Sequence, residues 1–209
     1  MKNNNWELDP KKFLPRKDAE KLLAVAKARA ESTNAKEMKT AVRDYFILHL
    51  GLATGLRVME MAALKCGHLS LEDTIPSLFV ENGKGKKRRR VFFNGPFKEH
   101  CKEYLAWKQS VGESIESDQP LFLSSNTGGH MTTRALQKAF KRCAQNAGLP
   151  PHYSIHCLRH TYACMLLKAS NWNLRLVQKQ LGHSKITTTQ VYADVMLPEI
   201  KKALDRLYL

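Results

Sequence analysis

The chain has 209 residues, enough for one well-buried core or two small ones, and its 43% hydrophobic content is ordinary for a globular protein. It carries 34 Lys and Arg against 19 Asp and Glu, a net charge of +15 that indicates a polyanionic partner. Nucleic acid fits this charge better than a membrane, because no stretch approaches the roughly 20 apolar residues of a spanning helix. The five cysteines form no C-x-x-C pair and are expected to be reduced and mostly buried. The N-terminus shows no export signal, so we expect a cytoplasmic protein.

Apolar residues recur at helical spacing through most of the chain, after a polar N-terminal tail of residues 1–12. Gly55 separates the second expected helix from the third, and Gly182 marks a later helix end. Two runs of β type, residues 75–80 and 90–93, flank the turn-forming segment ENGKGKK and predict a small hairpin or three-stranded sheet. We therefore expect one mostly helical α+β domain with a small antiparallel sheet. The expected helices cover residues 15–30, 37–53, 57–64, 97–107, 132–147, 156–169, 173–181, 187–195 and 198–208.

Four separated segments each carry a group suited to a phosphodiester. They are TGLRVME around Arg57, ENGKGKKRRR around Lys84, HCLRH from His156 to His160, and LGHSKITTTQVYADV, which contains His183 and Tyr192. Guanidinium forks stabilise negative charge that builds on two non-bridging phosphate oxygens better than point charges do. A phenol with an ordinary pKa near 10 needs a proton acceptor or a strongly positive site before it attacks well.

In this order the segments resemble the tyrosine recombinase (phage integrase) family, whose pattern is Arg, Lys, His-x-x-Arg, His or Trp, then Tyr. The resemblance implies a catalytic domain of that family over residues 13–209, with the family's N-terminal core-binding domain absent. It implies that the protein cleaves and rejoins double-stranded DNA through a 3′-phosphotyrosine, without ATP, cofactor or metal. It also implies a homotetramer on DNA, with a monomer when free, in which the apolar stripe of residues 198–209 docks on a neighbouring protomer; packing on its own chain explains that stripe equally well.

The resemblance gives five residues a role around the scissile phosphate. Arg57 and Arg159 match the two family arginines that bind the phosphate. Tyr192, nine positions after His183, matches the nucleophile. His156 is the expected acceptor of the phenolic proton, and His183 would donate a hydrogen bond to a phosphoryl oxygen.

The basic segment around Lys84 allows more than one interpretation. By resemblance Lys84 protonates the departing 5′ oxygen, a task that suits a flexible ammonium, although Lys86 or Lys87 could be aligned in its place. The same run is typical of a patch that follows the phosphate backbone, so Lys86, Lys87, Arg88 and Arg89 are also expected to contact DNA phosphates. It does not match a P-loop, because no G-K-[ST] follows at the required spacing.

Two further residues are expected to support the site. Glu60, three residues after Arg57, either orients a catalytic side chain from behind or forms an ordinary i, i+3 surface pair. His160 lies four residues after His156, a spacing that also suits two zinc ligands. That motif has no nearby carboxylate and carries the cationic Arg159 between the histidines, so we expect no metal and a buried structural role for His160.

Other classes of protein share some of these features. A type IB topoisomerase uses the same groups to relax DNA, but the compact spacing from LGH to the tyrosine favours a recombinase. A non-catalytic DNA-binding regulator predicts a decayed site, whereas all six catalytic positions are filled here. A metal-dependent nuclease would lose its activity in EDTA.

Overall fold

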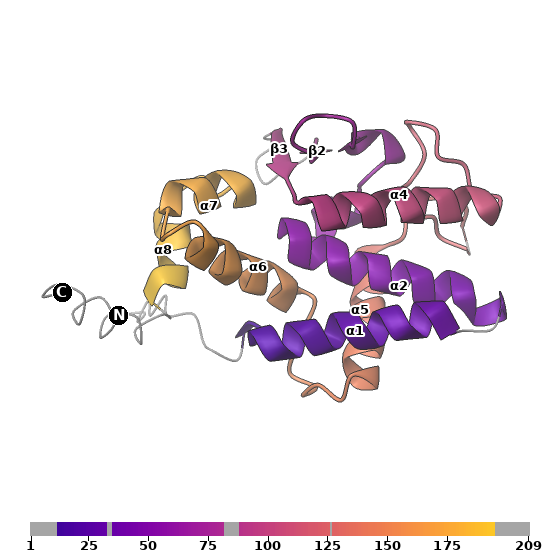
Figure 1. Cartoon of the computed structure of the whole chain (residues 1–209), viewed down its shortest axis with the longest axis horizontal. Helices are drawn as coiled ribbons and strands as arrows, with labels where there is room; N and C mark the ends of the chain where they lie inside the picture. The colour runs from indigo at the N-terminus through magenta and orange to yellow at the C-terminus, as the bar shows by residue number, and fades with distance from the viewer. Residues whose placement is uncertain (1–11, 33–34, 82–87, 126, 195–209) are drawn as a thin grey trace, which may run out of the picture.

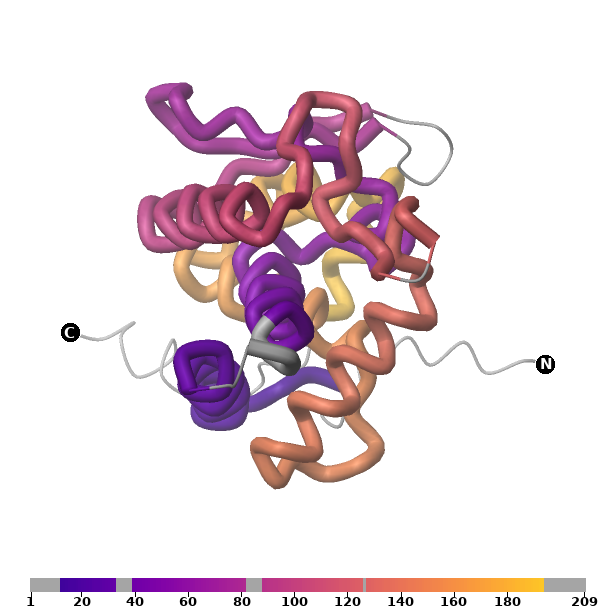
Figure 2. Tube along the Cα trace, turned by 90° about the vertical axis from the view of Figure 1, so that its right-hand side faces the viewer, coloured from indigo at the N-terminus to yellow at the C-terminus, as the bar shows by residue number. Residues whose placement is uncertain are grey.

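Helix α2 (Ala35–Thr54) runs through the middle of the molecule and contacts four other helices (Figure 1). The computed structural model describes residues 12–32, 35–81, 88–125 and 127–194. Phe46, Ile47, Leu48 and Leu50 of α2 are fully buried, as a helix covered on several sides requires. Its neighbours are α1 (Arg16–Ser32), α4 (Gly95–Ser110), α5 (Thr133–Asn146) and α6 (His156–Ala169). Helices α1, α2 and α4 lie roughly alongside one another and appear nearly end-on in Figure 2.

A second, smaller hydrophobic cluster joins α6 to the last two described helices, α7 (Leu174–Leu181) and α8 (Thr187–Asp194). Leu167 of α6, Val177 and Leu181 of α7 and Tyr192 of α8 belong to it, and all four are buried. The three helices stand together at one side of the molecule in Figure 1. This cluster therefore sets the position of the segment that carries His183 and Tyr192.

The sheet has three antiparallel strands in the order β1 (Leu69–Ser70), β2 (Ser77–Val80) and β3 (Arg89–Phe92). Leu78 pairs with Val91, and both side chains are fully buried on the face that meets the core. Strand β3 also contacts α7. Arg89, the first residue of β3, pairs with Val80, the last residue of β2. Along the chain, α3 (Val58–Ala62) and the short 3-10 helix η2 (Cys66–His68) connect α2 to β1.

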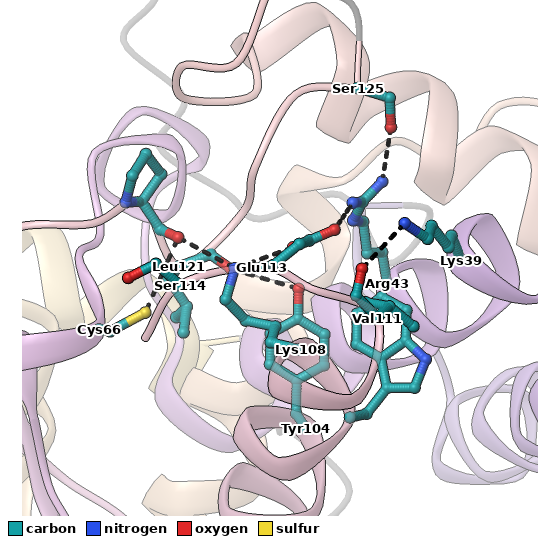
Figure 3. A network of polar contacts seen from close by, with 12 residues as sticks. Lys39, Arg43, Cys66, Tyr104, Lys108, Val111, Glu113, Ser114, Leu121 and Ser125 are labelled. Atoms are coloured by element: carbon teal, nitrogen blue, oxygen red, sulfur yellow. Dashed lines mark hydrogen bonds and ion pairs between the residues drawn. The ribbon is translucent and has the colours of Figure 1, made fainter. Parts of the chain in front are cut away.

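A buried ionic network holds the segment after α4 against α2 (Figure 3). The Lys108 ammonium, 1% exposed, donates to Glu113 Oε2 at 2.9 Å and to the Pro120 carbonyl oxygen at 3.3 Å. Glu113 also accepts a hydrogen bond from Arg43 of α2, and Arg43 Nη1 donates to Ser125 Oγ at 2.9 Å. A loop without regular secondary structure is thus fixed by buried charges that neutralise one another.

The expected fold class, a mostly helical α+β domain with a small antiparallel sheet, is confirmed, and the sheet has three strands. Helix α4 begins two residues earlier than expected, because the Asn94 side chain accepts a hydrogen bond from the Phe97 backbone N–H and caps it. The expected helix over 198–208 lies outside the described residues. The five cysteines are reduced and buried, as expected. Within the described ranges, no helix combines the length and the apolar character that crossing a membrane requires.

Candidate active site

Arg159 is buried where α6 meets the α2–α3 turn and the end of α7. Its Nη1 donates to the Gly55 carbonyl oxygen at 2.6 Å, and its Nη2 donates to the Leu181 carbonyl oxygen at 2.9 Å. The turn requires glycine at position 55, because φ is +61° and an added Cβ would overlap the Tyr162 ring. Burial, followed by the charge of Arg57, lowers the pKa of Arg159 to about 10, so the guanidinium remains cationic at neutral pH.

Arg57 caps the start of α3, and 28% of its side chain is exposed. Its backbone N–H donates to Glu60 Oε2 at 2.8 Å, and its Nη1 donates to Glu60 Oε1 at 3.0 Å. The i, i+3 pair that the sequence allows is therefore present, and it also fixes the direction of the guanidinium. The backbone N–H and Nη1 of Arg57 are thus bound to Glu60, while the exposed part of the side chain remains accessible to a ligand.

Glu60 joins Arg57 to a second arginine, Arg89 of β3. The Glu60 side chain is only 3% exposed, and Arg89 Nη1 and Nη2 donate to its Oε1 and Oε2 at 2.8 and 2.9 Å. Burial raises the pKa of Glu60, but the hydrogen bonds and charges of Arg89 and Arg57 outweigh burial and bring the pKa below its ordinary value. The sequence predicts a DNA-phosphate contact for Arg89, whereas the structure directs its guanidinium inward.

His183 and Tyr192 face each other across the connection between α7 and α8. Their rings are nearly parallel, with centroids 6.3 Å apart, and His183 Nδ1 lies 3.0 Å from the hydroxyl oxygen of the buried Thr189. Burial, followed by the charges of Arg159, Arg57 and Arg89, lowers the pKa of His183 to about 3. The imidazole is therefore neutral at pH 7 and lies within electrostatic reach of all three guanidinium groups.

The Tyr192 hydroxyl contacts His160, and not the expected proton acceptor His156. Tyr192 is 4% exposed, and its Oη lies 3.2 Å from His160 Nδ1. Burial raises the pKa of Tyr192 above its ordinary value, against the charges of Arg159 and Arg57. Burial, followed by the charge of Arg159, lowers the pKa of His160 to about 4. His160 is thus partly buried, as expected, but it holds the phenol that the sequence identifies as the nucleophile.

His156, at the first turn of α6, is exposed and lines an open groove of about 830 Å³ beside α5. The α5 side of the groove carries Arg134, Lys138 and Lys141, and no carboxylate lines it among the described residues. Arg142 also lines it, but its guanidinium is paired with Asp44 at 2.6 and 2.7 Å. The His156 imidazole thus shares one groove with basic side chains of α5.

The remaining predicted residues fall on the hairpin between β2 and β3. Lys84, Lys86 and Lys87 lie outside the described residues. Arg88, directly before β3, is exposed. No cluster of three or more potential metal ligands occurs among the residues with a described position, so the His156–His160 pair has no third ligand there.

Two residues at the site have no counterpart among the predicted ones. Thr189 contacts His183, and the Gln180 side chain bonds both to the backbone N–H of Phe92 at 3.1 Å and to its carbonyl oxygen at 3.2 Å. The two hydrogen bonds from Gln180 to the Phe92 backbone join α7 to β3 in the way that a neighbouring strand would. Both residues act through contacts between distant segments, for which the sequence carries no local signal.

Comparison with known proteins shows which family the chain belongs to. A model of the phage integrase family matches residues 12–197. The chain belongs to the phage integrase family.

One relative of this phage integrase family member is tyrosine recombinase XerC of Neisseria meningitidis serogroup C. It is 33% identical over 80% of this chain and 52% of its own length. Tyrosine recombinase XerD of Rickettsia bellii is 34% identical over 76% of this chain and 53% of its own length. The chain thus spans about half the length of these curated relatives. Among solved structures, the XerH site-specific recombinase bound to palindromic difH substrate, a post-cleavage complex, matches 96% of this chain and 54% of its own with a TM-score of 0.74 at 25% identity.

Proposed function

We propose that this chain is the catalytic part of a site-specific DNA recombinase, in which Tyr192 attacks a phosphodiester and forms a 3′-phosphotyrosine. The observation that supports the proposal is that Arg57, Arg159, His183 and Tyr192, which come from separate segments, lie within electrostatic or ring contact of one another. Two fixed guanidinium groups suit the two non-bridging oxygens of a phosphate.

The reaction conserves the number of phosphate ester bonds. The Tyr192 oxygen attacks phosphorus, the bond from phosphorus to the 5′ oxygen breaks, and the departing oxygen takes a proton from Lys84. A free 5′-hydroxyl from a second strand then attacks the phosphotyrosine and restores the phenol. Because each step exchanges one ester for another, neither ATP nor a metal ion is needed to supply energy.

His183 and His156 have different roles in the proposed reaction. A neutral His183 that accepts the Thr189 hydroxyl hydrogen at Nδ1 carries its own hydrogen on Nε2 and donates it to a phosphoryl oxygen. His156 is exposed, so it can accept the phenolic proton once DNA is bound. The structure has the buried Tyr192 hydroxyl at His160, so the proposed attack requires this hydroxyl to move toward the phosphate.

The substrate we propose is double-stranded DNA that follows the basic groove of α5. Lys138 and Lys141 in the groove suit phosphate oxygens, and His156, the proposed proton acceptor, lines the same groove. The complex of the XerH recombinase with its difH substrate shows that a structural relative binds DNA. We expect the enzyme to meet this substrate in the cytoplasm.

We also propose a homotetramer on DNA and a monomer in its absence. An apolar groove of about 570 Å³ between the start of α1 and α6 is lined by Phe13, Leu14, Met165 and Ala169, and Met165 is 40% exposed. Residues 198–209 of a neighbouring protomer, with their apolar stripe, fit this surface by chemistry. Gel filtration with and without DNA, on the full chain and on a chain ending at residue 197, tests it: loss of the DNA-dependent assembly on truncation is expected.

The decisive experiment uses nicked suicide substrates drawn from a library of DNA sites, followed by denaturing electrophoresis. The full-length protein should form a covalent adduct in EDTA, and Tyr192→Phe should abolish it. Tyr162→Phe is the matched control, because Tyr162 is buried in the same cluster and should leave the adduct intact. An adduct that survives Tyr192→Phe refutes the assignment.

The recombinase is favoured over DNA relaxation by the names of the relatives, which are site-specific recombinases. Relaxation of supercoiled plasmid without strand exchange between two sites would reverse that preference. Activity that EDTA removes would indicate a metal-dependent nuclease.

A further inference from the structure

The Arg89 side chain is largely buried, whereas those of its neighbours Arg88 and Arg90 are exposed. Its side chain is 12% exposed, whereas that of Arg90 is 55% exposed and pairs with the exposed Asp73, and Arg88 is exposed. Both terminal nitrogens of Arg89 donate to Glu60, and its Nε donates to the Gln180 carbonyl oxygen at 3.3 Å. All three nitrogens have partners within the protein, so this guanidinium is not free to bind a DNA phosphate.

Gly182 provides the space in which Arg89 lies. Its φ is +66°, at the left-handed end of α7, and an added Cβ would lie 2.7 Å from Arg89 Cδ and 2.8 Å from its Nε. The backbone directly before His183 is therefore packed against the Arg89 side chain. The last carbonyl groups of α7 accept from two arginines, Arg89 at Gln180 and Arg159 at Leu181, which suits the negative end of a helix dipole.

The charge balance around Glu60 gives this contact a consequence for Arg57. With Arg89 in place, two guanidinium groups share one carboxylate, and one positive charge remains for a ligand. Without Arg89, Arg57 alone would balance the buried Glu60 carboxylate. The charge of Arg57 would then be neutralised within the protein and would not be available to a ligand. Arg89 therefore acts on the phosphate site through Glu60.

We propose that Arg89 is a positioning residue for DNA cleavage, which aligns Arg57 through Glu60 and His183 through the end of α7, and that it does not bind the DNA backbone. This inference rests on the proposed function for its kinetic readout. It assigns different tasks to three consecutive arginines: Arg88 faces outward toward the expected DNA, Arg89 organises the site, and Arg90 pairs with Asp73 at the surface.

The test compares Arg88→Ala, Arg89→Ala and Arg90→Ala in two assays on the full chain. Single-turnover cleavage of a suicide substrate at saturating DNA should fall on the order of 100-fold for Arg89→Ala, because catalytic groups are misaligned. The DNA dissociation constant should change far less than the cleavage rate, because the phosphate bound by Arg57 is one backbone contact among several; Arg90→Ala serves as the control in both assays. Removing the carboxylate as well, in Glu60→Gln/Arg89→Ala, should recover part of the lost rate, because Arg57 is then no longer neutralised.

Two results would overturn the inference. One is cleavage by Arg89→Ala at the rate of Arg90→Ala. The other is a Glu60→Gln/Arg89→Ala variant that cleaves no faster than Arg89→Ala, which would show that Glu60 does not act on Arg57 when Arg89 is removed. If Arg89→Ala does not fold, Arg89→Lys replaces it, because one ammonium cannot hold both Glu60 oxygens and the Gln180 carbonyl group, and the same criteria apply.

A third measurement needs no DNA and separates this inference from the proposed function. Amide hydrogen exchange in the free protein should be faster over residues 181–189 in the Arg89 variant than in Arg90→Ala. Equal exchange there refutes the positioning role even if the protein is a recombinase. An adduct that persists in Tyr192→Phe refutes the proposed nucleophile but leaves the exchange result standing.

Discussion

Replacing Gly182 with alanine tests how closely the end of α7 is packed against Arg89. The new Cβ would lie 2.7, 2.8 and 3.0 Å from three atoms of the Arg89 side chain, at a residue whose φ is +66°. The left-handed conformation costs an L-residue about 1–2 kcal/mol, and overpacking adds about 1–3 kcal/mol. Gly182→Ala should therefore lower the free energy of unfolding by roughly 2–5 kcal/mol and also slow DNA cleavage, because Arg89 must move away from Glu60.

Gly148→Ala is the matched control. Gly148 also follows a helix with φ at +63°, but its nearest neighbour to an added Cβ, Lys21 Nζ, is 3.8 Å away. This variant should lose only the conformational part, about 1–2 kcal/mol, and should cleave DNA normally. Urea denaturation followed by circular dichroism gives the difference, and each kcal/mol should lower Tm by about 2–4 °C in a chain of this size. Equal losses in the two variants, with equal cleavage, would show that the Arg89 contact does not constrain α7.

Three further results are expected. Stability to urea should fall as pH decreases from 7 to 5. Burial lowers the pKa of His100 and of His183 to about 3, whereas the unfolded chain protonates both histidines near 6.5, so each contributes up to about 1.4 kcal/mol of lost stability per pH unit. A stability that does not change with pH would contradict this. Glu113→Gln should destabilise the protein by about 3–5 kcal/mol, because it leaves the Lys108 ammonium buried without its carboxylate, whereas Lys108→Met keeps the Arg43–Glu113 pair and should cost less in the same titration. Lys138→Gln should reduce the slope of log Kd for DNA against log salt by about 0.9, and an unchanged slope would remove this residue from the DNA path.

The helices could be predicted because each has its own local signal of apolar spacing and end residues. The residues of the site could be predicted in order along the chain, although their contacts could not. Arg89 shows where a local rule was available: side chains alternate along a strand, and Arg89 shares a face with the buried Val91 while Arg90 points outward. The basic run KKRRR suggests one exposed patch only if that alternation is ignored.

His160 shows the opposite case, in which no local rule exists. His156 and His160 lie one turn apart on α6, and the sequence cannot say which of them meets the phenol. That choice depends on how α8 packs on α6 through the cluster that contains Leu167 and Val177. The position of a nucleophile on a later helix is therefore a result of tertiary packing.

The contact between Tyr192 and His160 does not activate the phenol. His160, with a pKa of about 4, is a weak base, and burial holds the pKa of Tyr192 above 10. Proton transfer from Tyr192 to His160 is therefore unfavourable, because the pKa of the acceptor is lowered and that of the donor is raised. His160 can therefore hold the phenol without activating it, and activation must come from elsewhere. In the proposed mechanism, a DNA phosphate bound by Arg57 and Arg159 and the exposed imidazole of His156 supply that activation, which ties cleavage to substrate binding.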